Sequence, residues 1–311
     1  MRVLRGVDEL VKPSAGSALT IGTFDGVHEG HRALVRRTRE LAAELGAESA
    51  AVTWDRHPAE TLRPDKAPPL ITSTGRKIDL LGQTGLDMTA VLEFDRELSS
   101  WPPERFVEQI LAEGLGARSI VVGEGWRFGR GAAGDTELLA KVGEKMGFTV
   151  EAATLETIGG EPVSSSRIRK LVAAGEVEEA RDLLGRPFDI DAEVVHGDDR
   201  GKSLGFPTAN LSTFARYLQP AQGVYACRAR VGDAWYKAAT NVGVNPTFGG
   251  HHSYSPVRIE AHLIDFTEDI YGSTLRLEFH KRLRDEERYD KVEDLVAQIH
   301  KDVEATRSLV D

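Results

Sequence analysis

The chain has 311 residues, more than one hydrophobic core usually fills, so two domains are expected. Its composition is 41% hydrophobic and 28% charged, which suits a folded protein and excludes a wholly disordered chain. The 49 acidic residues outnumber the 39 basic ones and give a formal net charge of −10, which disfavours general nucleic-acid binding but allows a local basic pocket for a small anion.

The first half of the chain alternates short apolar runs with helical patterns. The runs, which we predict to be strands, cover residues 18–23, 49–54, 88–94, 119–123 and 148–153. Because strands and helices alternate, we expect an α/β domain with a doubly wound parallel sheet and helices on both faces. The proline-rich residues 56–72 are predicted to form a loop. In the first helical segment, one apolar stripe at the 3.6-residue period carries Leu34, Thr38, Leu41 and Leu45.

The pattern changes after Gly185. Turn signals separate a series of short strands, and such a series predicts a small antiparallel β-barrel. A final helix with one apolar face is predicted to begin near Lys291. We therefore expect one domain at residues 1–185 and a second at 186–311. The strands predicted in the second domain are residues 188–195, 224–231, 235–242, 257–264 and 275–283.

Three further features of the sequence predict that the protein lies inside the cell. No apolar stretch approaches the roughly 18–20 residues of a membrane span, and charged residues interrupt the N-terminus, so we expect neither a membrane segment nor a signal peptide. The single cysteine, Cys227, excludes an intramolecular disulfide and is predicted to be a buried structural thiol. We expect a cytoplasmic protein that binds neither nucleic acid nor membranes.

A glycine-rich turn joins the first predicted strand to the first long helix and carries two histidines, His28 and His31. Ligands of open α/β sheets bind at the carboxyl ends of strands, and a helix N-terminus attracts phosphate. Histidines three residues apart can face the same phosphate and donate hydrogen bonds to developing negative charge. The alternative is a pair of solvent-exposed histidines near a turn.

A second cluster, Ser164-Ser165-Ser166-Arg167-Ile168-Arg169, precedes another helical segment. The simplest interpretation is a serine N-cap. However, arginines in a first helical turn oppose the helix dipole unless an anion compensates, and hydroxyls with guanidinium groups suit a polyphosphate. Two other glycine-rich stretches, residues 129–134 and 197–203, are not predicted to be a dinucleotide fingerprint or a P-loop, because their strand and helix context is wrong.

The second half offers a separate candidate site. Thr208 and Asn210, if extended, point the same way and suit a Mg²⁺ ion that carries ATP phosphates. In the strand 257–264, Arg258, Glu260 and His262 share the face opposite the apolar residues. Glu260 can take a proton from an alcohol that attacks a γ-phosphate. The alternatives are a polar turn and a solvated strand carboxylate.

Eight motifs in this order resemble the bacterial bifunctional riboflavin kinase/FMN adenylyltransferase (FAD synthetase) family, over nearly the whole chain. They are G-T-F-D-G-V-H-x-G-H (22–31), W-D-R-H-P (54–58), V-V-G-x-x-W-R-F-G (121–129), S-S-x-R-I-R (164–169), L-L-G-R-P-F (183–188), G-x-x-x-G-F-P-T-A-N (201–210), N-V-G-x-N-P-T-F (241–248) and E-A-H-L-I-D-F (260–266).

The resemblance implies that the first domain is a Rossmann-like nucleotidyltransferase that makes FAD from FMN and ATP and releases pyrophosphate. His28 and His31 would stabilise the triphosphate during attack, and Arg167, with the serines before it, would hold the leaving pyrophosphate. The other residues it assigns to this nucleotide site are Gly22, Thr23, Phe24, Asp25, Ser164 and Ser165.

The same resemblance implies that the second domain is a riboflavin kinase, which converts riboflavin and ATP to FMN and ADP. Glu260 would be the base toward the ribityl hydroxyl, and Thr208 and Asn210 would bind Mg²⁺ and ATP. A nucleotide loop would contain Gly201, Lys202, Gly205 and Phe206.

Two alternatives stay open. Gly125 and Trp126 stand where the family commonly has Asn or Asp followed by Phe, so the chain could be a riboflavin kinase with an impaired adenylyltransferase domain. A non-catalytic flavin carrier is the other alternative, although His28, His31 and Glu260 count against it.

Overall fold

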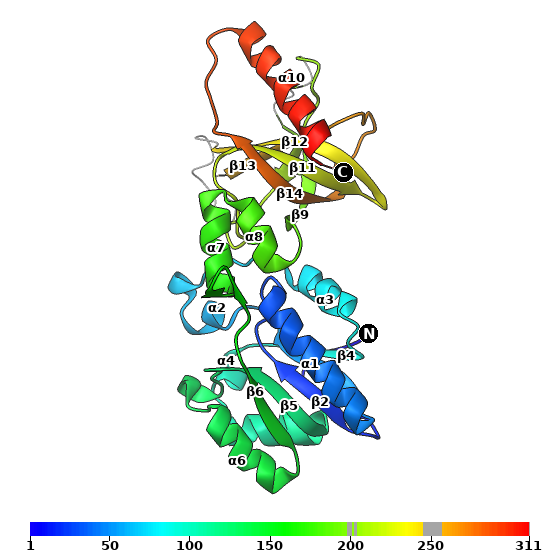
Figure 1. The fold of residues 1–311 in the computed structure, drawn as a ribbon, viewed down its shortest axis with the longest axis vertical. Helices are drawn as coiled ribbons and strands as arrows, with labels where there is room; N and C mark the ends of the chain where they lie inside the picture. The colour runs from blue at the N-terminus through cyan, green and yellow to red at the C-terminus, as the bar shows by residue number, and fades with distance from the viewer. Residues whose placement is uncertain (198–200, 202–203, 245–256, 311) are drawn as a thin grey trace. The chain divides into compact units, whose positions relative to one another are not determined.

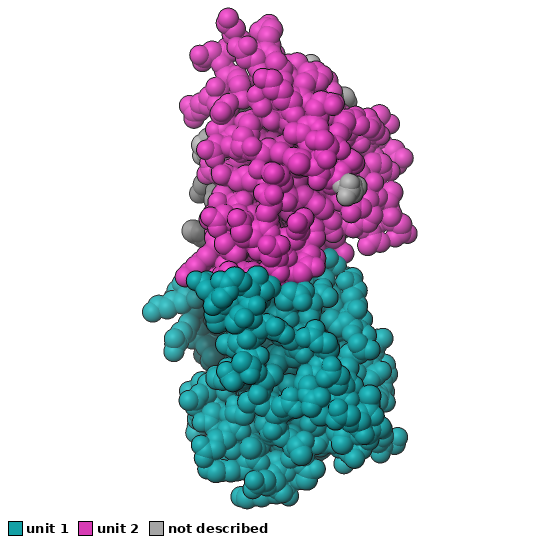
Figure 2. Space-filling view, in the orientation of Figure 1, with its two compact units in different colours: residues 1–68, 74–164 teal, residues 69–73, 165–311 magenta. Residues whose placement is uncertain are grey.

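The computed structural model describes residues 1–197, 201, 204–244 and 257–310 (Figure 1). The chain forms two compact units (Figure 2). The first comprises Met1–Pro68 and Thr74–Ser164, and the second comprises Pro69–Ser73 and Ser165–Asp311. The helices α7 (Ser165–Ala174) and α8 (Val177–Leu184) therefore belong to the second compact unit. The functional domains expected at 1–185 and 186–311 stay a prediction.

A six-stranded parallel sheet forms the centre of the first unit, in the order β1-β4-β3-β2-β5-β6. The five strands predicted from apolar runs are present. The edge strand β1 is not predicted by the sequence, because its four residues, RVLR, contain no apolar run. The strands are β1 (Arg2–Arg5), β2 (Ser17–Ile21), β3 (Glu48–Trp54), β4 (Met88–Leu92), β5 (Ala117–Gly123) and β6 (Thr149–Ala153).

Both faces of this sheet are buried. Successive side chains of a strand point to opposite faces, and in β3 Ala50 and Val52 belong to one apolar cluster with Phe106, whereas Ala51 belongs to another with Val35. A parallel sheet needs this double cover, which helices provide. The predicted doubly wound α/β architecture is confirmed.

The helix α1 (Glu29–Leu45) packs on the sheet through a narrower stripe than predicted. Its buried residues are Val35, Thr38 and Ala42, so of the predicted stripe only Thr38 is buried. The small side chains face the strands, which lets the helix backbone approach the sheet closely. The other residues of the predicted stripe are only half-buried: Leu34, Leu41 and Leu45.

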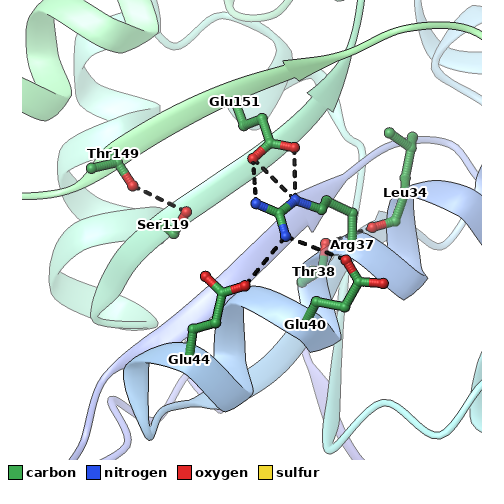
Figure 3. Close-up of polar contacts among 8 residues, drawn as sticks. All are labelled: Leu34, Arg37, Thr38, Glu40, Glu44, Ser119, Thr149 and Glu151. Atoms are coloured by element: carbon green, nitrogen blue, oxygen red, sulfur yellow. Dashed lines mark hydrogen bonds and ion pairs between the residues drawn. The ribbon is translucent and has the colours of Figure 1, made fainter.

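An ion-pair network fixes the exposed side of α1 to the edge strand β6 (Figure 3). The Arg37 guanidinium donates to both carboxylate oxygens of Glu151, with Nε to Oε1 at 2.9 Å and Nη2 to Oε2 at 3.0 Å. Glu40 and Glu44 of the same helix accept from Nη1. These carboxylates, Glu151 first, raise the pKa of Arg37.

The prediction of a plain loop at residues 56–72 is wrong, because it contains the short helix α2 (Pro58–Leu62) and the 3₁₀ turn η1 (Pro64–Lys66). A capping box starts α2: His57 Nδ1 accepts from the Ala59 N–H, and Glu60 accepts from the His57 N–H. Pro58 at the first helical position is compatible with this start. The remaining elements of the unit are α3 (Thr74–Gln83), α4 (Arg96–Ser99), α5 (Pro103–Phe106), the π-helical η2 (Val107–Gly114), η3 (Arg130–Ala132), α6 (Thr136–Met146), β7 (Thr157–Ile158) and β8 (Glu161–Pro162).

The second unit contains a closed antiparallel barrel in the order β10-β13-β12-β11-β14-β9, as predicted. Its strand β10, which begins directly after the 207–208 turn, is not predicted because it has only four residues. Cys227 of β11 is fully buried, and burial raises the pKa of its thiol, which confirms the structural role. The elements are β9 (Phe188–Val195), β10 (Ala209–Ser212), β11 (Gly223–Val231), β12 (Ala234–Val244), β13 (Val257–Leu263), β14 (Thr274–Arg284) and α10 (Val292–Leu309).

Candidate active sites

The turn between β2 and α1 has an unusual backbone. Phe24 and Val27 are fully buried and adopt positive φ angles of 50° and 41°, a conformation that costs energy in residues other than glycine. Gly26, between them, has φ 86° and tolerates it. Asp25 is 3% exposed. The turn is thus a strained structure at the carboxyl end of a central strand, where α/β proteins bind ligands.

The structure brings His28 and His31 together. Their rings stack with centroids 3.6 Å apart. His28 is the N-cap of α1, and its Nδ1 accepts a hydrogen bond from the His31 backbone N–H at 3.3 Å. Since Nδ1 accepts, a neutral His28 carries its proton on Nε2, where it can donate to a ligand.

His31 is held as a neutral imidazole. Burial lowers its pKa well below the ordinary value, and the nearby positive charges of His28 and Lys77 lower it further. Among the described residues its Nδ1 has no hydrogen-bond partner. His31 can therefore supply a neutral N–H donor to a phosphate, and His28 can donate from Nε2 beside it.

Lys77, which the sequence analysis does not single out, lies buried beside this turn. It projects from α3, is 6% exposed, and donates from Nζ to the Thr23 carbonyl at 3.2 Å and to the Trp54 carbonyl at 2.7 Å. The sequence does carry one signal that Lys77 is buried. It lies three and four residues before the fully buried Leu80 and Leu81, and therefore on the buried face of α3.

The serine cluster spans the division of the chain. Ser164 ends the first unit, Ser165 begins α7 in the second, and Arg167 lies in the first turn of α7. Arg169 Nε donates to the Pro69 carbonyl at 2.7 Å, within the second unit. The pyrophosphate role of Ser164, Ser165 and Arg167 stays a prediction.

The glycine run at residues 129–134 is not a dinucleotide fingerprint. The strand β5 ends at Gly123, several residues earlier, and the run is closed by a bridge between Phe128 and Gly134. The next helix, α6, begins only at Thr136. Because the fingerprint requires its glycines directly between strand and helix, the sequence-based exclusion is confirmed.

In the barrel, Asn210 of β10 lies directly opposite Glu260 of β13. Arg258 joins them: its Nη2 lies 2.9 Å from Glu260 Oε1 and 3.0 Å from Asn210 Oδ1. The predicted two-faced pattern of β13 is confirmed from Arg258 onward. Ile259, Ala261 and Leu263 are buried, whereas Arg258, Glu260 and His262 line a cavity.

Two cavities lie on either side of Thr208, which lines both. The first, of about 290 Å³, contains Glu260, and its walls combine apolar and aromatic side chains, such as Leu295 and Tyr289, with charged ones, such as Arg284 and Asp302. The second, of about 360 Å³, is lined by inward-facing residues of β13, such as Ala261, and by the segment that follows this strand. The sequence cannot reveal these cavities, because residues far apart in the chain form their walls.

The glycine turn before Thr208 lies at the first cavity. The Phe206 N–H donates to the Gly201 carbonyl at 2.9 Å, and a side chain on Gly201 would come within 2.4 Å of the Phe206 carbonyl oxygen. Gly205 has φ 88°. Phe206 is 8% exposed and its ring packs edge-on against His262. Lys202 lies outside the described residues.

Comparisons with known proteins agree for both halves. The family model described as FAD synthetase matches residues 11–167, and the one described as riboflavin kinase matches residues 184–310. A Pseudomonas fluorescens protein named bifunctional riboflavin kinase/FMN adenylyltransferase is 38% identical, over 99% of this chain and 98% of its own length. The protein of the same name from Escherichia coli K12 is 34% identical, over 97% of this chain and 96% of its own.

Among solved structures, one described as a macrolide-efflux protein from Streptococcus pneumoniae has a TM-score of 0.87 and 29% identity, with 99% of each chain covered. In the part of the present chain that the structure describes, no helix has the length and apolar character of a membrane span. The full-length relatives and the two matching family models show that the chain belongs to the bifunctional riboflavin kinase/FMN adenylyltransferase family.

Proposed function

We propose that this protein makes FAD from riboflavin in two ATP-dependent steps. The barrel domain phosphorylates riboflavin to FMN, and the α/β domain adenylylates FMN to FAD. The observation that carries the proposal is the position of Thr208 between two cavities, one of which contains Glu260. Such an arrangement suits a reaction that moves a phosphoryl group from one bound molecule to another.

The chemistry assigns one substrate to each cavity. A general base must lie within hydrogen-bond reach of the hydroxyl that it deprotonates, so riboflavin belongs in the cavity with Glu260. The aromatic and apolar part of its lining, Tyr289, Leu295 and Ile299, suits a flavin ring. ATP then belongs in the cavity on the other side of Thr208. Glu260 takes the proton of the ribityl hydroxyl, the hydroxyl oxygen bonds to the γ-phosphorus, and ADP leaves.

The residues present suit a magnesium ion at this point. The Thr208 hydroxyl, the Asn210 amide oxygen and the ATP phosphates are hard oxygen donors of the kind Mg²⁺ prefers. When bound, the ion would neutralise phosphate charge. Arg258 contacts the Asn210 oxygen, so that oxygen must be shared with or released by the guanidinium when a cation binds.

For adenylylation, the α1 N-terminus and the two stacked histidines support ATP binding at the end of β2. A phosphate oxygen of FMN bonds to the α-phosphorus of ATP, the bond from this phosphorus to the bridging oxygen breaks, and pyrophosphate leaves. His28 and neutral His31 donate hydrogen bonds to the charge that develops. Ser164, Ser165 and Arg167 are proposed to hold the pyrophosphate, and Gly22 to Asp25 to line the nucleotide.

The kinase-only alternative has no support from the comparisons, because both family models match and the relatives are named as bifunctional. Gly125, the residue that suggested this alternative, has a φ angle of 74°, a conformation that suits glycine.

One chromatographic assay tests the proposal. The protein is incubated with Mg²⁺-ATP and either riboflavin or FMN, and flavins are separated over time. We expect FMN and then FAD from riboflavin, and FAD directly from FMN. Accumulation of FMN with no FAD from either substrate would favour the kinase-only alternative, and bound flavin without ATP consumption would favour the carrier.

A further inference from the structure

The buried amine of Lys77 is a feature for which the proposed reactions have no assigned use. Its Nζ donates to two backbone carbonyls, those of Thr23 and Trp54, which follow or end the neighbouring parallel strands β2 and β3. These carbonyls belong to two different motifs, G-T-F-D-G and W-D-R-H-P. One side chain from a third element therefore ties together the two chain segments that form this edge of the sheet.

Charged groups from four elements surround Lys77. Burial lowers its pKa to about 8, and three carboxylates act in the opposite direction. The positive charge of Lys77 in turn lowers the pKa of His31. The carboxylates are those of Asp25 after β2, Asp55 after β3 and Glu60 of α2, and the imidazole is that of His31 near the start of α1.

This arrangement is costly for a lysine that only fills space. A methionine side chain would occupy a similar volume without the penalty of burying a charge. Titratable groups perturbed by burial and by specific charged partners concentrate at functional sites. The hydrogen bond from Lys77 to the Thr23 carbonyl also lies at the start of the strained turn that contains Phe24 and Val27.

We propose that Lys77 is a positioning residue for FMN adenylylation, which fixes the turn bearing His28 by joining the Thr23 and Trp54 carbonyls. The inference depends on the proposed adenylyltransferase activity. Lys77 acts through the Thr23 and Trp54 carbonyls and electrostatically on His31, so it is not assigned a contact with ATP.

The test uses the full-length protein with Lys77→Met and Lys77→Arg, and Lys141→Met as the control. Lys141 is an exposed lysine of the same unit, which pairs with Glu137 within α6. For each protein we would measure kcat and KM for FMN adenylylation, riboflavin phosphorylation in the same preparation, and the pKa of His31 by NMR. The kinase reaction checks the second unit, and the dispersion of the NMR signals in the same samples checks that the first unit, which contains Lys77, is folded.

Lys77→Met is expected to lower kcat for FMN adenylylation by roughly 10- to 100-fold, the effect of misplacing reacting groups. It should raise the pKa of His31 and leave riboflavin phosphorylation within about twofold of wild type, as should Lys141→Met. Unchanged adenylylation, or an unchanged His31 pKa, would overturn the inference.

The arginine variant decides the question even if Lys77→Met does not fold. Wild-type kcat for adenylylation should fall as the pH rises through about 8, because a neutral amine donates more weakly to the two carbonyls than the charged ammonium does. Lys77→Arg keeps its charge at this pH, so its profile should not fall there. The same alkaline fall in both proteins would overturn the inference. A wild-type protein that makes no FAD at any pH would instead refute the proposed function.

Discussion

Asn210 and Glu260 face each other across the β10–β13 ladder, and the guanidinium of Arg258 contacts both. This arrangement orients the proposed base and a proposed magnesium ligand with one side chain. Arg258→Met removes both contacts and should lower riboflavin phosphorylation about tenfold, equivalent to about 1.4 kcal/mol in the activation barrier.

Lysine cannot reproduce the forked geometry of a guanidinium, so Arg258→Lys should restore only part of this rate. The measurement is kcat for riboflavin phosphorylation, with FMN adenylylation in the same sample as the control. If both variants matched wild type, Arg258 would have no positioning role.

Glu260→Gln should lower riboflavin phosphorylation by about 10²- to 10⁴-fold, the usual contribution of a general base, because an amide cannot accept the hydroxyl proton. Adenylylation of supplied FMN should persist. Glu193→Gln, on an exposed position of β9 in the same barrel, is the matched control and should leave both activities intact. Loss of both activities in folded Glu260→Gln would contradict the assignment of one site to each domain.

The histidine pair should give the opposite result, provided that the helix cap is preserved. Alanine at 28 would also remove the N-cap of α1, which costs about 1 kcal/mol in stability. Asparagine keeps an acceptor for the His31 N–H and removes the imidazole. His28→Asn with His31→Asn should therefore abolish FMN adenylylation and retain riboflavin phosphorylation, as flavin chromatography would record. Continued FAD synthesis would exclude the histidines from catalysis.

The buried amine of Lys77 also predicts a pH dependence of stability. Its pKa is lowered to about 8 in the folded chain, against about 10.5 when unfolded, so the folded state binds fewer protons between these values. Wild-type stability relative to Lys77→Met should therefore rise by about 3 kcal/mol as the pH increases from 8 to 10.5. Urea unfolding of both proteins across this range measures the difference. A constant difference would mean that the pKa is not lowered.

A buried ion pair attaches α10 to the barrel. Arg284 of β14 donates from Nη2 to Asp302 Oδ2 at 2.8 Å, and the Asp302 side chain is 8% exposed. Asp302→Ala leaves a largely buried guanidinium without this partner and should lower the free energy of unfolding by about 3 kcal/mol. Because α10 forms one wall of the cavity that contains Glu260, the KM for riboflavin should rise as well.

The control for this pair is Asp233→Ala, which removes a fully exposed partner of Arg230 and should leave the urea midpoint unchanged. Equal midpoints for Asp302→Ala and wild type would show that α10 is held by its apolar contacts alone.

The sequence by itself determined the two fold classes and most of the chemistry. Periods of 3.6 and 2 residues are local properties, so they predict the parallel α/β half and the barrel, as well as the polar face of β13 with Glu260. Short elements such as β1, α2 and β10 are missed or mistaken for loop, because few residues carry their pattern and neighbours decide their state.

Only the tertiary structure decided how the candidate groups combine. The pairing of Asn210 with Glu260 depends on strand register, and the two cavities at Thr208 depend on the closure of the barrel. Lys77 appears in the sequence as an ordinary lysine of an amphipathic helix. Its spacing before Leu80 and Leu81 places it on the buried face of α3, but its role follows from its contacts with the Thr23 and Trp54 carbonyls, which lie tens of residues away in the chain.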